Sequence, residues 1–235
     1  MSKSTIPKTP RVPKEGTHTD RKVKYQITKK IVLNQEQKQA QQTILENDLT
    51  ILTGKAGSGK SYLAVVTALE MLSKREIEQI IITRPITDVQ NLGFLPGDIN
   101  DKMDPWIAPI YDIIEEMFGG KDQLNLLKQD GRIKIVPNQY MQGRTFTKKF
   151  VIVDECQNLT NELTLGILTR LGKEGKMVFC GDINQIQIRN KNHTGMKKLL
   201  SMSTKVNGVG FFELVNNHRH PIVEKILDFY GKEDI

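Results

Sequence analysis

One short segment, residues 54–61 with the sequence GKAGSGKS, constrains the fold of this chain more than any other. It matches the pattern G-x-x-x-x-G-K-[ST] at every fixed position. An apolar run, Leu49–Thr53, precedes it, and a helical stretch, Lys60–Ser73, follows it. Glycines let a backbone wrap around an anion, and the N–H groups of such a loop and of the next helix attract phosphate. With this context, a chance glycine-rich turn is the weaker interpretation, and the segment predicts a phosphate-binding loop, or P-loop.

Short apolar runs alternate with helical stretches along the rest of the chain. Continuously apolar strands that alternate with helices imply a parallel sheet covered on both faces, so the predicted class is an α/β P-loop fold. The segment between Leu95 and Leu127 has no strand signal and is expected to be a mostly helical insertion. The expected strands are Leu49–Thr53, Gln79–Thr83, Ile133–Val136, Phe150–Val153, Met177–Cys180 and Gly210–Val215. Further helices are expected near Asn161–Leu171 and Thr194–Met202, and over Pro221–Tyr230 with proline in the first turn.

The positive charge of the chain is concentrated at its N-terminus. The net charge is +7, yet residues 1–30 hold nine Lys or Arg against two acids, while the remaining 205 residues hold 25 of each. We therefore expect a basic N-terminal arm, residues 1–30, with its first twenty or so residues poorly ordered, followed by one domain, residues 31–235. Such an arm is suited to bind phosphate backbones, although a merely solubilising tail fits equally well.

The composition excludes membrane and secreted classes. The 38% of apolar residues suffices for a core, but no run reaches the ~18 consecutive apolar residues that a membrane helix needs. The N-terminus lacks the apolar segment of a secretory signal. Cys156 and Cys180 each follow an apolar run without metal-ligand spacing, which is typical of buried, reduced thiols. A cytoplasmic protein with no membrane partner is expected.

A second chemical motif follows about a hundred residues after the P-loop. The strand Phe150–Val153 ends in two acids, within the sequence FVIVDECQN. Strands often end in acids by chance, but after a P-loop this arrangement places carboxylates opposite the bound phosphates. Asp154 is expected to hold Mg²⁺ through water, and Glu155 to polarise the attacking water. The second acid favours hydrolysis of the nucleotide over transfer to a small acceptor.

A third motif, CGDINQ, occupies residues 180–185. A polar side chain just past a strand, here Gln185, can touch the γ-phosphate or the attacking water and so report hydrolysis to the nucleic-acid side. The alternative is an ordinary strand-to-loop turn, because Gly-Asp pairs are common in turns. The order of the three motifs along the chain favours the functional interpretation.

Taken together, these motifs resemble the N-terminal RecA-like domain of superfamily 1 helicases and, more closely, the PhoH-like ATPase family. The resemblance covers roughly residues 31–232. It is carried by Gln37 within LNQEQKQA, GKAGSGKS, ITRP (82–85), LGFLPGD (92–98), the segment with Pro105, Pro109 and Asp112, QGRTF (142–146), DECQN, GDINQ and HRHP (218–221). LGFLPGD together with QGRTF is specific, whereas the P-loop alone is not. Cys156 and Gln142 depart from the family pattern, where Ala and Arg are common.

The resemblance implies roles for several side chains. Gln37 would contact adenine, unless it is one of many solvated glutamines at a helix start. Arg84 would lie near the phosphates or the nucleic-acid face, unless it is a surface arginine. Arg144 and Arg219 are candidates for an arginine finger that neutralises charge on the γ-phosphate. The alternative for each is that it is only a partner in a salt bridge. Lys60 is expected to contact the β- and γ-phosphates, and Ser61 and Asp154 to bind Mg²⁺. The residues expected to hold the nucleotide are Gln37, Gly54, Lys55, Ala56, Gly57, Ser58, Gly59, Lys60, Ser61 and Tyr62.

Members of the family are thought to act on RNA, and longer ones carry a PIN nuclease domain. We expect neither that domain nor a second RecA-like domain here, which argues against autonomous unwinding. A single such domain would borrow an arginine from a neighbour, so a ring-shaped homo-oligomer, such as a hexamer, is expected. The leading hypothesis is an ATPase that uses ATP and Mg²⁺ and is stimulated by RNA or another single-stranded nucleic acid. The alternatives are a P-loop kinase and a nucleotide-switched binding module without catalysis.

Overall fold

The protein is built around a parallel sheet of six strands. The structure, a computed structural model, describes residues 26–85, 99–188, 190–218, 222–223, 225–226 and 229. In these residues the strands follow the order β3-β2-β4-β5-β1-β6, and every neighbouring pair is parallel. The strands are β1 (Leu49–Gly54), β2 (Gln79–Thr83), β3 (Ile133–Ile135), β4 (Lys149–Val153), β5 (Lys176–Gly181) and β6 (Val209–Leu214). The expected RecA-like α/β fold is thereby confirmed.

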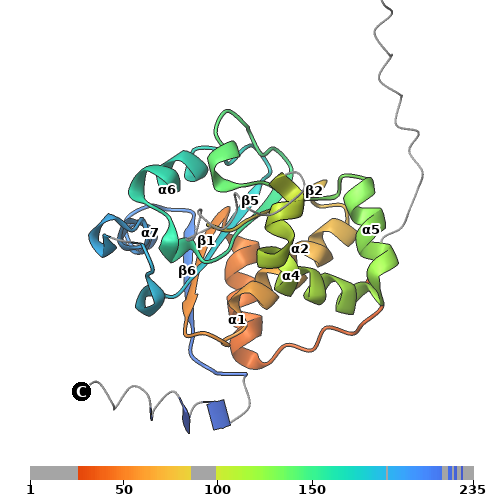
Figure 1. Ribbon diagram of the computed structural model, residues 1–235, viewed down its shortest axis with the longest axis horizontal. Helices are drawn as coiled ribbons and strands as arrows, with labels where there is room; N and C mark the ends of the chain where they lie inside the picture. The colour runs from red at the N-terminus through yellow and green to blue at the C-terminus, as the bar shows by residue number, and fades with distance from the viewer. Residues whose placement is uncertain are drawn as a thin grey trace, which may run out of the picture.

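Helices cover both faces of this sheet (Figure 1). One face carries α1 (Gln35–Glu46), α2 (Lys60–Ser73), α4 (Ile99–Phe118) and α5 (Lys121–Gln129); the other carries α6 (Asn161–Leu168) and α7 (Met196–Ser203). Short 3₁₀ turns are η1 (Asn138–Tyr140), η2 (Cys156–Asn158), η3 (Ile183–Gln185) and η4 (Lys191–His193). Helices α4 and α5 form the expected helical insertion. Most of the expected closing helix and of the LGFLPGD segment lies outside the described residues.

Two hydrophobic cores hold the layers together, one on each face of the sheet. Alternate side chains of a strand point to opposite faces, so Leu52 joins the core under α1, α2 and α4 while its neighbour Ile51 joins the core under α6 and α7. Both side chains are fully buried. Burial of one such side chain contributes roughly 1.5–3 kcal/mol. The strands are thus held firmly enough to fix the loops at their carboxyl ends.

The strand order brings the three sequence motifs to one place. The P-loop follows β1, the DECQN segment follows β4, and the GDINQ segment follows β5. These strands are neighbours in the order β4-β5-β1, and parallel strands end at the same edge of a sheet. In open α/β sheets, ligands bind in the crevice at that edge.

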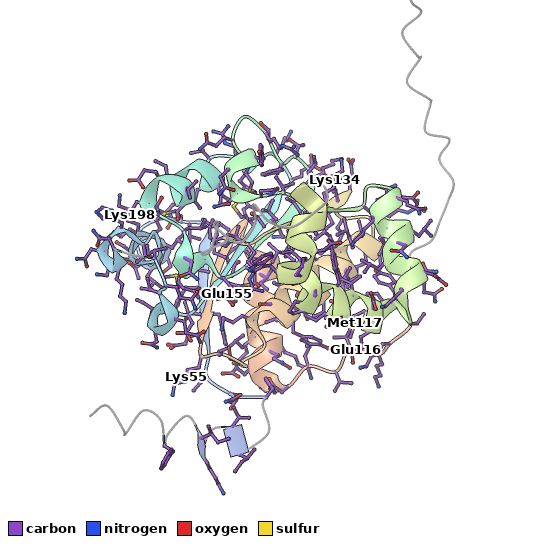
Figure 2. All side chains as sticks on the ribbon, viewed as in Figure 1. Lys55, Glu116, Met117, Lys134, Glu155 and Lys198 are labelled. Carbon is purple, nitrogen blue, oxygen red and sulfur yellow. The ribbon has the colours of Figure 1, made fainter. Side chains whose placement is uncertain are left out.

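The last residues of the basic arm are attached to the end of α4. The backbone N–H groups of Thr28 and Lys29 donate to the Met117 carbonyl at 3.0 and 3.2 Å. The Lys29 ammonium forms an ion pair with Glu116, which Figure 2 labels beside Met117. These two residues are therefore held against this helix. Within the described part of the chain, no helix is sufficiently long and apolar to span a bilayer.

Candidate active site

The P-loop has a positive φ at three glycines, Gly54, Gly57 and Gly59. Gly54 has φ 145°, and a Cβ there would stand 2.3 Å from the Leu214 carbonyl oxygen on β6. Gly59 has φ 86° and caps the N-terminus of α2 without a side-chain hydrogen bond. The first N–H groups of α2 therefore have no side-chain cap, which is the arrangement that attracts a phosphate.

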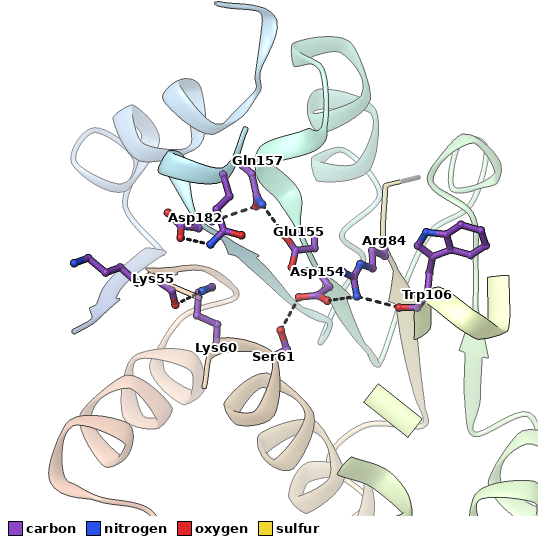
Figure 3. Close-up of polar contacts among 10 residues, drawn as sticks. Lys55, Lys60, Ser61, Arg84, Trp106, Asp154, Glu155, Gln157 and Asp182 are labelled. Atoms are coloured by element: carbon purple, nitrogen blue, oxygen red, sulfur yellow. Dashed lines mark hydrogen bonds and ion pairs between the residues drawn. The ribbon is translucent and has the colours of Figure 1, made fainter. Parts of the chain in front are cut away.

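Lys60 folds back over this loop (Figure 3). Its ammonium donates to the carbonyl oxygens of Gly54 at 2.6 Å and Lys55 at 3.0 Å. Among the described residues, no carboxylate forms an ion pair with Lys60. Its positive charge is therefore not neutralised within that part of the chain, and it is half-buried beside the loop that would cradle phosphates.

Ser61 and Asp154 meet across the site. The Ser61 hydroxyl donates to Asp154 Oδ1 at 2.6 Å. Burial raises the pKa of Asp154, whose residue is only 4% exposed, and the hydroxyl of Ser61 and the guanidinium of Arg84 oppose that shift. A buried carboxylate and a hydroxyl are hard oxygen donors of the kind that Mg²⁺ prefers, and Mg²⁺ commonly takes its other ligands from water and substrate phosphates. This pair therefore fits a magnesium ion, although the described residues contain no cluster of three or more His, Cys, Asp or Glu.

Arg84, at the end of β2, joins both acids of the DECQN segment. One guanidinium nitrogen lies 3.6 Å from Asp154 Oδ2, and the other lies 3.6 Å from Glu155 Oε1. The first nitrogen also donates to the Trp106 carbonyl of α4 at 2.9 Å. The sequence left open whether Arg84 lies near the phosphates or is a surface arginine. The structure places it beside the two acids, because β2 and β4 are adjacent strands.

A chain of hydrogen bonds links Glu155 to the GDINQ segment, and its central member is Gln157. The Gln157 amide donates to Glu155 Oε2 at 2.6 Å, and its oxygen accepts from the Asp182 N–H at 3.1 Å. Asp182 Oδ2 in turn accepts from Gln185 Nε2 at 2.7 Å. Glu155 has φ 51°, in the left-handed region that non-glycine residues rarely adopt. The sequence assigned no role to Gln157; the available signal was its place within the DECQN motif, and the structure buries it fully.

Gln37 lies beside the P-loop and is buried. It closes a capping box at the start of α1, where its N–H donates to Asn34 Oδ1 at 2.8 Å. Its side-chain nitrogen lies 3.3 Å from Nε2 of His218, and the His218 N–H donates to the Gly57 carbonyl at 3.0 Å. The structure therefore excludes the solvated glutamine considered from sequence and adds His218, which had been noted only within HRHP.

A cavity of about 280 Å³ collects most of the expected residues. Its lining consists of Ala56, Gly57, Gly59, Lys60, Ser61, Tyr62, Asp154, Glu155, Cys180, Gly181, Asp182 and Gln185. Gly54 and Ser58 are buried in the loop and Lys55 is exposed on it. Arg144 is exposed and lines a different groove, near β3. Arg219 lies outside the described residues.

Similarity to known proteins extends over most of the chain. The model of the family described as PhoH-like protein matches residues 30–231. The chain belongs to the PhoH-like family. It is 40% identical over 191 residues to the PhoH-like protein of Bacillus subtilis (strain 168), covering 80% of this chain and 60% of that one. It is 39% identical over 201 residues to the PhoH-like protein of Synechocystis sp. (strain ATCC 27184 / PCC 6803 / Kazusa), covering 84% and 61%.

The fold also matches a solved structure. The large terminase from a thermophilic bacteriophage aligns with a TM-score of 0.52 at 11% identity, over 83% of this chain and 49% of that one. This similarity supports the fold alone. The PhoH-like chain spans about 60% of the length of the two bacterial relatives.

Proposed function

We propose that this PhoH-like chain hydrolyses ATP with Mg²⁺ and that single-stranded nucleic acid, RNA foremost, stimulates the hydrolysis. The observation that carries the proposal is the 2.6 Å hydrogen bond from Ser61 to Asp154, with Glu155 and Lys60 lining the same cavity. This constellation combines a phosphate cradle, a metal-binding pair and a second acid, which are the parts that nucleotide hydrolysis requires.

Each side chain has a defined task in this mechanism. The P-loop N–H groups and Lys60 hold the β- and γ-phosphates, while Gln37 contacts the adenine. Ser61 and Asp154 hold Mg²⁺, which supplies neutralisation of the phosphate charge when bound. Glu155 orients the attacking water and takes its proton, and Gln157 keeps Glu155 in place. Gln185, joined to this group through Asp182, reports the state of the γ-phosphate to the nucleic-acid side.

The second acid separates hydrolysis from the alternative functions. A P-loop kinase would require an acceptor pocket and no water activator, whereas Glu155 lines the phosphate cavity and is held by Gln157 and Arg84. A nucleotide-switched module without catalysis would have no need to hold this carboxylate in a left-handed backbone conformation. Turnover therefore distinguishes the three functions.

Assembly into a ring-shaped homo-oligomer is part of the proposal. Arg144 does not line the cavity of its own chain, so it can act on a γ-phosphate only from a neighbouring subunit. An arginine in this role typically contributes ~10³–10⁵ in rate. Both cysteines are free and buried, which agrees with the cytoplasmic setting that we propose.

The test is an ATPase assay with Mg²⁺, performed without nucleic acid and with single-stranded RNA or DNA, beside a measurement of mass in solution. Lys60→Ala protein serves as the matched control, because it removes the fixed positive charge at the phosphates. We expect turnover by the wild type, a further increase with RNA, and none by the variant. Equal turnover by both proteins would refute the site, and tight ATP binding without turnover would support the switched module.

A further inference from the structure

A groove of about 670 Å³ lies beside β3, apart from the P-loop cavity. Because β3 and β1 are separated by β2, β4 and β5 at about 4.8 Å per step, the groove lies about 19 Å across the sheet from the strand that carries the P-loop. The groove and the P-loop cavity have no lining residue in common. The groove is lined by Asp104, Tyr111, Lys128, Ile133, Lys134, Ile135, Val136, Pro137, Tyr140 and Arg144.

The lining is positively charged. Lys128, Lys134 and Arg144 face a single acid, Asp104. That acid already accepts a hydrogen bond from the Tyr111 hydroxyl at 3.0 Å and lies 3.9 Å from the Lys128 ammonium. Within the described parts of the chain, no carboxylate pairs with Lys134 or Arg144. The groove therefore presents cations to an anionic ligand.

The two tyrosines of the groove have different environments. Tyr111 is buried, and the Lys128 ammonium lies 3.5 Å from its ring centroid, so this ring holds one cation in place. Burial raises the pKa of Tyr111, which keeps its hydroxyl protonated as the donor to Asp104. Tyr140, by contrast, is 55% exposed at the end of η1. An exposed ring beside unpaired cations is the combination on which single-stranded bases stack while their phosphates are neutralised.

Strand β3 adds backbone groups to this surface. Among the described strands, β3 pairs with β2 alone. The residues that flank β3 make hydrogen bonds to β2 through the Arg132 carbonyl and the Val136 N–H, so the backbone groups of even-numbered residues face β2. In such a ladder the N–H and C=O groups of the intervening residues, Ile133 and Ile135, point away from the partner strand. They supply donors and acceptors along the floor of the groove, and Lys134 stands at this edge of the molecule, far from Lys198 on α7 (Figure 2).

We infer that this groove, with Lys134 and Tyr140 as its principal contacts, binds a single-stranded nucleic acid. The inference rests on the proposed function, for which it supplies the site of the stimulating strand. Lys134 contacts a phosphate, Tyr140 stacks on a base, and Lys128 extends the positive surface. Double-stranded nucleic acid is excluded as the ligand, because its bases are already stacked and cannot reach Tyr140. Helix α4 lines the groove and also contacts Arg84, which joins both acids of the ATP site.

The experiment measures the affinity of the full chain for labelled single-stranded RNA and DNA by fluorescence anisotropy over a range of salt concentrations. The groove variant is Lys134→Gln combined with Tyr140→Leu, and Tyr140→Phe is the conservative variant that keeps the ring. The matched control is Lys205→Gln combined with Phe211→Leu, an exposed lysine and a partly exposed ring at the opposite, β6 edge. ATP hydrolysis without nucleic acid is measured for every protein.

We expect the groove variant to bind about tenfold or more weakly, since the loss of a stacked base weakens binding roughly fivefold at the least and the lost phosphate contact weakens it further. The slope of log affinity against log salt should fall by about 0.7 for one lost phosphate contact. Tyr140→Phe and the control should bind as the wild type, and hydrolysis without nucleic acid should be unchanged throughout. If the groove variant binds as tightly as the control, the groove is not the site, although the proposed function survives. If the wild type binds neither RNA nor DNA, the groove and the proposed stimulation both fail. If only the groove variant loses binding, but nucleic acid does not stimulate hydrolysis by the wild type, the groove is the binding site and the proposed stimulation is wrong.

Discussion

Replacement of Gln157 by methionine tests the positioning of Glu155 most directly. Methionine is unbranched and similar in length, so it fills the same fully buried position while removing both hydrogen bonds of the amide. The Asp182 N–H, in a residue only 6% exposed, loses its acceptor at 3.1 Å. A buried N–H without a partner costs about 1–3 kcal/mol. The middle of that range is about 2 kcal/mol, and for a chain of this size each kcal/mol lowers the unfolding temperature by ~2–4 °C. We therefore expect the midpoint of thermal unfolding to fall by about 4–8 °C.

The effect on hydrolysis should exceed the effect on ATP binding. The Glu155 carboxylate loses its hydrogen-bond donor at 2.6 Å but stays beside Arg84. The carboxylate therefore remains in the site but is no longer held in its correct position. A misplacement of about 1 Å at a reacting centre costs on the order of 10² in rate. We therefore expect kcat to fall about a hundredfold, while ATP affinity, set by Lys60 and the P-loop, changes little.

Single-turnover hydrolysis, equilibrium nucleotide binding and thermal unfolding together measure these quantities. The control is Gln39→Met, an exposed glutamine on α1 where both residues favour a helix equally, and it should leave all three unchanged. A Gln157→Met protein that is less stable but hydrolyses bound ATP at the wild-type rate would refute the positioning role and leave Gln157 purely structural.

Three further changes test the remaining assignments. Glu155→Gln should retain ATP binding but lose about 10²–10⁴ in hydrolysis rate, whereas Asp154→Ala should weaken Mg²⁺-dependent binding; normal hydrolysis by Glu155→Gln would place the base elsewhere. Deletion of residues 1–24 removes seven positive and two negative charges and should lower the salt dependence of RNA binding, with unchanged ATPase activity in the absence of RNA; unaltered binding at low salt would make the arm a tail. Arg144→Ala protein should bind ATP without turnover, and mixing it with Lys60→Ala protein should restore part of the activity if subunits exchange; an active wild-type monomer would exclude the ring. If Arg144→Ala retains full turnover while Arg219→Ala does not, the finger is Arg219.

The strands and the P-loop could be predicted from the sequence because short, continuous segments of the chain specify them. Each strand is a short, largely apolar run, and the four inner strands are buried on both sides. The expected bounds agree with β2 without change and with the other strands within one residue at either end. The helix expected near Asn161–Leu171 ends earlier, at Leu168, because the chain turns toward a bridge between Phe146 and Leu171.

The contacts between motifs were not readable, because they depend on the strand order. Arg84 meets two acids some seventy residues downstream only because β2 lies beside β4. Gln157 has its second partner on the loop after β5, and Gln37 meets His218 through a contact spanning 181 residues. Polar side chains carry no periodic signal that specifies such partners, so chain pattern alone left Gln37 ambiguous and Gln157 unassigned.

The place of β1 in the sheet also sets the order in which the protein can be completed during synthesis. Leu49 pairs with Met177 on one side and with Val209 on the other, so both neighbours of this strand are made long after it. At about 5–20 residues per second, a ribosome needs roughly 8–30 s to produce the second neighbour. During that interval an apolar strand with two unpaired edges is exposed to other chains, and pairing between such distant segments is intrinsically slow. Of the strands described, the one that carries the P-loop therefore waits longest for its partners.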